Sequence, residues 1–91
     1  MKNLFNSLFL SSRGGKTRIK IVEALFKKSY NTNQLAKTLG MQYRTINYHL
    51  EILLDKEIVE KEDKKYGASY FISNKLYKNK KYLEEIKKII G

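Results

Sequence analysis

The sequence contains no cysteine, no proline and no tryptophan, and it has a single histidine, His49. Without cysteine, the chain can form neither a disulfide nor a zinc site with thiolate ligands, and it has no cysteine nucleophile. One histidine also excludes a site with several histidine ligands from one chain. The composition therefore predicts that the protein holds no metal and no cofactor.

Long hydrophobic runs are lacking as well, because no stretch approaches the roughly 18 to 20 apolar residues that span a bilayer. The start, MKNLFNSLFLSS, resembles a short signal peptide, but polar residues interrupt its apolar segment and no small-residue cleavage pattern follows. Its apolar residues fall on one face of a helix over residues 1–12. They are Leu4, Phe5, Leu8 and Phe9. We expect a cytoplasmic protein without a membrane partner.

Acidic residues are few: 9 Asp and Glu stand against 19 Lys and Arg, for a formal net charge of +10. This balance favours an anionic partner, either nucleic acid or a membrane surface. Biased coding is the alternative, since Lys, Ile and Asn are all abundant. A length of 91 residues favours one domain over residues 1–91. A membrane-surface role is the weaker interpretation, because the chain has the pattern of a full globular core.

Helical periodicity divides the first part of the chain into three helices, expected over residues 16–29, 30–40 and 43–56. The second has clear ends. Asn31 is a good N-cap with Gln34 three residues later, and Gly40 stands where a left-handed residue ends a helix. The second and third helices, joined through this glycine, form a helix-turn-helix.

The remainder predicts a hairpin and a final helix. Residues 58–73, IVEKEDKKYGASYFIS, are rich in β-branched and aromatic residues around a polar turn, which is typical of two paired strands. A hairpin directly after a helix-turn-helix is a wing. Residues 74–91 have an apolar helical face and predict a C-terminal helix. The expected fold class is α+β and mostly helical: a winged helix-turn-helix of three helices and a two-stranded wing, with added N- and C-terminal helices.

This order of elements resembles the winged-helix domain of ArsR-like transcriptional regulators, particularly short archaeal members. The residues that carry the resemblance are NQLAKTLGMQYRTINYHLEILLDKEIVEK, supported by RGGKTRIKIVEAL, within residues 13–73. The resemblance implies homodimers packed through terminal helices and a third helix in the major groove of double-stranded DNA. It also implies metal sensing in the best-known branch. That property is not carried over, because the chain lacks the cysteine and histidine ligands.

The third helix has two faces. Ile46, Leu50 and Leu53 set the direction of the core, and Arg44 and Tyr48 point nearly opposite, with Asn47 at the border. Arg can bind a guanine edge through two hydrogen bonds, and Asn or Gln an adenine edge. We expect base-reading by Gln42, Tyr43, Arg44, Asn47 and Tyr48. The alternative is an ordinary solvated helix face.

Contacts with the DNA backbone are expected from two further places and from Thr45. Lys64 and Lys65 lie at the tip of the wing, although nearby acidic residues weaken this assignment. Lys16 and Arg18 open the first of the three helices, where backbone N–H groups favour an anion.

His49 attracts attention but is expected to be structural. It has no nucleophile beside it, no third group to orient it and no companion ligands. We therefore expect an imidazole packed at the edge of its helix and hydrogen-bonded to a neighbouring element, with a phosphate contact as the alternative. The chain also has no paired carboxylates in a plausible cleft and no phosphate-binding loop, so it is not expected to be an enzyme.

The leading hypothesis is a sequence-specific DNA-binding regulator that acts as a homodimer. The terminal apolar faces are candidates for the dimer interface, and the alternative is that they only cover the monomer core. The residues concerned are Leu4, Phe5, Leu8, Phe9, Leu83, Ile86 and Ile90. A winged-helix module that binds protein within a transcription or remodelling assembly is the second hypothesis.

Overall fold

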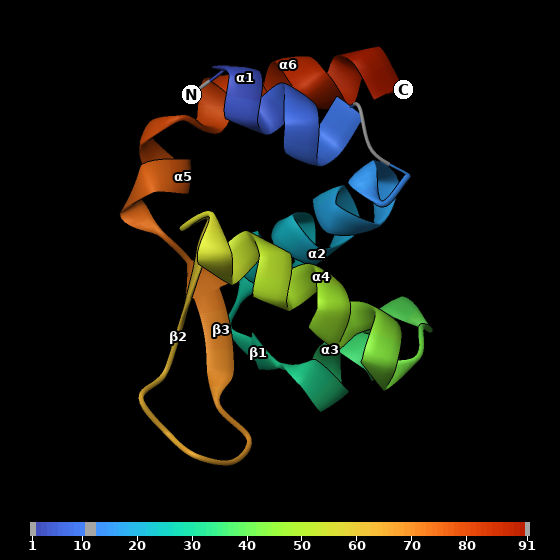
Figure 1. The fold of residues 1–91 in the computed structure, drawn as a ribbon, viewed down its shortest axis with the longest axis vertical. Helices are drawn as coiled ribbons and strands as arrows, with labels where there is room; N and C mark the ends of the chain where they lie inside the picture. The colour runs from blue at the N-terminus through green and yellow to red at the C-terminus, as the bar shows by residue number, and fades with distance from the viewer. Residues whose placement is uncertain (1, 11–12, 91) are drawn as a thin grey trace.

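The computed structural model describes residues 2–10 and 13–90 of the chain. Helices of the two chain ends, α1 and α6, lie side by side, away from the hairpin of β2 and β3 (Figure 1). The elements in chain order are α1 (Lys2–Phe5), the π-helix η1 (Asn6–Leu10), α2 (Gly15–Lys27), β1 (Tyr30–Asn31), α3 (Thr32–Leu39), α4 (Tyr43–Asp55), β2 (Val59–Lys61), β3 (Ser69–Ile72), α5 (Asn74–Lys78) and α6 (Lys80–Ile90).

The predicted helix-turn-helix is confirmed as α3 and α4. Asn31 caps α3 through a reciprocal pair: its side chain accepts from the backbone N–H of Gln34, and the Gln34 side chain accepts from the Asn31 N–H. Gly40 ends α3 in the left-handed conformation, with φ 65°. A residue with a Cβ would be strained at this φ, so the glycine permits the short turn that places α4 across α3.

We expect Asn31→Ala to lower the free energy of unfolding by about 1 kcal/mol, because alanine cannot accept the capping bond from the Gln34 N–H. Denaturant unfolding of the variant measures this loss. Asn33→Ala is the matched control, since Asn33 is exposed in the same turn and forms no capping bond. Equal stability of the two variants would contradict the role given to the cap.

The wing was predicted as two strands, but the sheet has three, in the order β1-β3-β2. β2 and β3 pair antiparallel, with Glu60 opposite Phe71. The additional strand, β1, pairs antiparallel with the other edge of β3, where Tyr30 lies opposite Tyr70. Two residues are too few for an alternating pattern, so this strand depends on its partner. The pairing anchors the wing to the segment just before α3.

The single C-terminal helix expected over residues 74–91 is also corrected, because it is divided into α5 and α6 at Asn79. The Asn79 side chain donates to the carbonyl oxygen of Lys75 at 2.8 Å, a local bond that competes with the regular helix. Ser73 begins α5: its hydroxyl accepts from Leu76 N–H, and its one proton lies within reach of two backbone oxygens, those of Glu57 at 2.7 Å and Ile58 at 2.9 Å. These bonds tie α5 to the end of α4.

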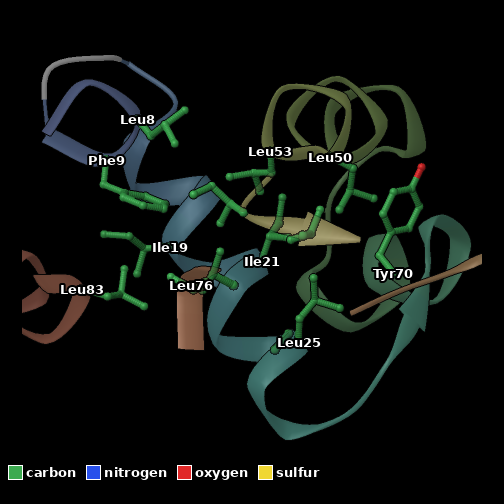
Figure 2. Packing of buried hydrophobic residues seen from close by; sticks show 14 of the residues in the cluster. Leu8, Phe9, Ile19, Ile21, Leu25, Leu50, Leu53, Tyr70, Leu76 and Leu83 are labelled. Atoms are coloured by element: carbon green, nitrogen blue, oxygen red, sulfur yellow. The ribbon is translucent and has the colours of Figure 1, made fainter. Parts of the chain in front are cut away.

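The N-terminal segment, expected as a helix over residues 1–12, consists of α1 and η1; residues 1, 11 and 12 lie outside the part described. Its apolar residues belong to the same core as α2, α4, α5 and α6. Figure 2 shows Leu8 and Phe9 of η1 near Ile19 of α2 and Leu83 of α6. Each such side chain contributes on the order of 2 kcal/mol by leaving water. The core thus holds the helix-turn-helix and both terminal segments together.

Candidate nucleic-acid interface

The polar face of α4 is exposed in the way that its helical spacing predicts. Ile46, Leu50 and Leu53 are fully buried, while Arg44 lies on the exposed side. Gln42, Tyr43, Thr45 and Tyr48 are also exposed, and the side chains of Tyr43 and Tyr48 keep more than half of their surface in solvent.

Asn47 differs from its neighbours because it is half-buried. Its amide donates to the Glu51 carboxylate at 3.5 Å, which is a long and weak hydrogen bond. Glu51, one turn further along α4, therefore has a partner in Asn47.

A polar recess of about 150 Å³ lies between the start of α3, the first half of α4 and the wing. Its lining includes Asn33 and Tyr43, with Lys61 and Lys65 from the wing, and contains no acidic residue. Thr32 also lines it and is only 7% exposed. Sequence reasoning missed Thr32, Asn33 and Lys61, because only the paired sheet brings the wing beside α3.

The tip of the wing is exposed at Lys64 and Lys65. Gly67, with φ 63°, turns the chain back toward β3. Glu62, an acidic residue close to these lysines, is bound within the hairpin: its carboxylate accepts a hydrogen bond from the Ser69 N–H at 2.7 Å. Its negative charge is therefore held at the base of the turn and does not extend freely beside the lysines.

Arg18 was predicted to contact phosphate, but it lies inside the protein. It is only 6% exposed and donates through one guanidinium nitrogen to the Leu8 carbonyl oxygen at 2.8 Å. Its Nε donates to His49 Nδ1 at 3.2 Å. We correct the assignment: Arg18 joins η1, α2 and α4 inside the protein. Lys16, two residues earlier, is exposed.

The predicted packing of His49 and its hydrogen bond to a neighbouring element are confirmed. The imidazole is 6% exposed and accepts a hydrogen bond from a neighbouring helix, at the edge of α4. It also lies against the backbone that begins α2, because a Cβ added to Gly14 would overlap its Cε1 atom. Burial, together with the positive charge of Arg18, lowers the pKa of His49 below 6.5.

This lowered pKa predicts how stability depends on pH. The unfolded chain takes up a proton near pH 6.5, whereas folded His49 takes it up only at lower pH. The stabilisation is therefore complete above pH 6.5 and is lost as the pH falls from there toward the folded pKa, with a slope of at most about 1.4 kcal/mol per pH unit. Unfolding free energies measured between pH 7.5 and 5.5 test this. In His49→Gln the slope should disappear; an unchanged slope would contradict the assignment.

The predicted dimer residues lie mostly inside the monomer, where they cover its core, as in the alternative interpretation of these faces. Leu4 and Ile90 are half-buried. The others are between 0% and 4% exposed, namely Phe5, Leu8, Phe9, Leu83 and Ile86. Their helical spacing was interpreted correctly, but α1, η1 and α6 bury these faces against each other and against α2. The apolar residue that remains on the surface of α6 is Ile89, at 70% exposure.

Neither a metal-ligand cluster nor a membrane-spanning helix is seen in the described ranges 2–10 and 13–90. No three acidic, histidine or cysteine side chains there come close enough to hold a metal ion. No helix within these ranges is long and apolar enough to cross a membrane.

The fold and the exposed helix α4 define a winged helix-turn-helix protein. Residues 15–61, just over half of the 91-residue chain, match the family described as bacterial regulatory protein, arsR family. The chain therefore belongs to the arsR family, which comprises transcriptional regulators and not enzymes. A comparison with curated proteins found no match.

Solved structures agree in fold. The transcriptional regulator BldR from Sulfolobus solfataricus has a TM-score of 0.73 at 14% identity, over 97% of this chain and 66% of BldR. The transcriptional repressor BigR from Xylella fastidiosa has a TM-score of 0.66 at 19% identity, over 96% and 80% of the two chains. Reduced HlyU from Vibrio cholerae has a TM-score of 0.66 at 15% identity, over 94% of this chain and 82% of HlyU. Identities this low establish the shared fold alone.

Proposed function

We propose that this regulator binds double-stranded DNA sequence-specifically as a homodimer. Helix α4 enters the major groove, and the wing contacts the backbone or the minor groove. The observation that carries the proposal is the exposed face of α4, where a guanidinium and two phenols stand at the N-terminal half of the recognition helix. That half is the part that reaches base edges in a helix-turn-helix.

The residues of this face divide by chemistry. Arg44 is suited to the two acceptors of a guanine edge, and Gln42 and Asn47 to an adenine edge. Tyr43 and Tyr48 can bond a phosphate or pack on a thymine methyl group. These base-reading roles remain predictions.

The backbone contacts are assigned to exposed positions around α4. Lys16, Thr45, Lys64 and Lys65 are all exposed and keep their expected roles. Lys61 joins them, because it lines the acid-free recess between the wing and α3. Each lysine that neutralises a phosphate releases counterions, so these contacts should make binding strongly dependent on salt.

The dimer interface is assigned to the outer side of α1 and α6. A groove of about 170 Å³ between these helices is lined by Lys2, Tyr82, Glu85 and Ile89, among others. Ile89 and Tyr82, at 70% and 38% exposure, provide apolar surface there. A second copy related by two-fold symmetry would bury both residues, and it would set two α4 helices to read a symmetric site with a half-site spacing of about 34 Å.

We expect Ile89→Lys to shift the protein from dimer to monomer, because the change places a charge in the centre of the apolar contact. Sedimentation velocity over a range of protein concentrations measures the shift. Lys88→Ala is the control, since this neighbouring residue is exposed and forms no ion pair with the described residues. A wild-type protein that is monomeric throughout the range would exclude the assigned interface.

Titration against random-sequence duplex DNA at several salt concentrations tests DNA binding itself. The logarithm of the association constant should fall linearly with the logarithm of salt, with a slope near −0.9 for each phosphate neutralised. Four exposed lysines per subunit predict a slope of several units. A flat dependence would instead favour a winged-helix module that binds protein.

A further inference from the structure

A second recess lies on the other flank of α4, beside the N-terminus of α2. It is open to solvent and has a volume of about 390 Å³. Its lining residues come from the segment that begins α2 and from the middle of α4. They are Arg13, Gly14, Thr17, Arg18, Tyr48 and His49. Two of them are cationic and none is acidic.

The hydrogen bond from Arg18 fixes the tautomer of His49. Because Arg18 Nε donates, His49 Nδ1 must be the acceptor, and the proton of the neutral ring lies on Nε2. The neutral form predominates at pH 7, since burial and Arg18 lower the pKa. The titratable groups that face the ring are Arg13, Arg18 and Tyr48, and η1 contributes no titratable side chain.

Among the residues that the structure describes, none accepts from the Nε2–H group of this buried ring. His49 is 6% exposed, and its only hydrogen bond to another described residue is the one at Nδ1. No fully buried side-chain nitrogen among the described residues lacks a partner, so Nε2 keeps access to solvent. The recess is the opening that His49 lines. Arg18 holds this donor in place, and a ligand bound in the recess could supply its acceptor.

The other groups around the recess are also suited to an anion. Helix α2 has 13 residues, and its N-cap residue Gly14 gives the first backbone N–H groups no side-chain capping bond. The guanidinium of Arg13 is exposed at the rim. Gly14 is required for this arrangement, because a Cβ there would overlap the His49 ring.

We propose that this recess is a binding site for a phosphate-type oxyanion, held by His49 Nε2–H, Arg13 and the first turn of α2. The oxyanion is either a phosphodiester of the DNA strand that borders the groove occupied by α4 or a free phosphate. The first source rests on the proposed function, while the second does not. In either case, an anion here touches Tyr48 and His49 of the recognition helix directly.

The single histidine makes the test specific, because the imidazole gives one set of NMR signals. Inorganic phosphate is titrated into the full-length protein at constant ionic strength, balanced with sodium chloride. We expect a saturable shift of the His49 signals and a higher apparent pKa, since the anion stabilises the charged ring. Arg13→Gln should weaken phosphate binding roughly tenfold. Lys88→Gln, which removes the same charge at a distance, should leave it unchanged.

A parallel titration with duplex DNA separates the two sources. Shifts with DNA alone identify the phosphodiester, shifts with phosphate alone identify a free oxyanion, and shifts with both show that either can occupy the site. If DNA binds but neither titration moves the His49 signals, the recess is not an oxyanion site, although the proposed function stands. If phosphate binds and DNA does not, the proposed function fails and the site remains. An Arg13→Gln variant that binds like the wild type also overturns the inference.

Discussion

Arg44→Ala should reduce affinity for the preferred DNA site by about 5- to 150-fold per recognition helix, which corresponds to a loss of roughly 1–3 kcal/mol. Arg44 is exposed in the first turn of α4 and can reach a guanine edge with two parallel N–H groups. The loss should concentrate at one base pair of each half-site, where the variant no longer prefers guanine. Competition assays with single-base variants of the site measure this change.

Arg44→Lys is the informative control. It keeps the positive charge but loses the planar pair of donors. We therefore expect Arg44→Lys to keep most of the affinity for random DNA and its salt dependence, while it loses discrimination at the same base pair. Should both variants keep the base preference of the wild type, Arg44 does not read a base.

Gly15→Ala should lower the free energy of unfolding by about 1–3 kcal/mol. In an exposed helix, alanine in place of glycine would normally stabilise by about 1 kcal/mol. Here a Cβ would overlap the backbone carbonyl group of Phe9, which cannot turn aside as a flexible side chain can. The overlap therefore outweighs the gain in helix propensity.

Its consequences should extend to the N-terminal segment, because η1 packs on both α2 and α6. Denaturant unfolding gives the loss of stability, and hydrogen exchange should show faster exchange in α1 and η1. Lys16→Ala is the control, since the next residue of the same turn is exposed. A Gly15→Ala variant as stable as this control would mean that η1 does not rest against the start of α2.

The helix-turn-helix could be predicted from sequence because its determinants are local. Asn31, Gln34 and Gly40 mark the two ends of α3, and the spacing of Ile46 and Leu50 orients α4. The third strand and the division of the C-terminal helix could not be predicted in the same way. β1 needs its partner β3, and the break lies at Asn79, whose side chain donates to the Lys75 carbonyl oxygen.

The candidate site shows a similar division between local and tertiary information. Exposure of Arg44 and Tyr48 follows from helical spacing alone. Burial of Arg18 left a signal in the sequence, since it shares the spacing i, i+4 and i+7 with Val22 and Leu25 on the core face of α2. Its basic character and its place at a helix start pointed toward phosphate instead.

The terminal apolar faces illustrate a limit of periodicity. Spacing identifies Phe5 and Leu83 as buried, but it cannot say whether the same chain or a second copy covers them. In the structure the chain itself covers both. The surface left for a second copy is the outer side of α6 around Ile89.

Selection of preferred sequences from a pool of randomised duplex DNA tests the central claim most directly, namely that the exposed face of α4 reads bases in the major groove. The account predicts an enriched motif made of two symmetric half-sites, centred about 10 to 10.5 base pairs apart or at a multiple of this spacing. With the Arg44→Ala variant, the preference for guanine at one position of each half-site should disappear. A pool that shows no enrichment, or a motif that Arg44→Ala leaves intact, would contradict it.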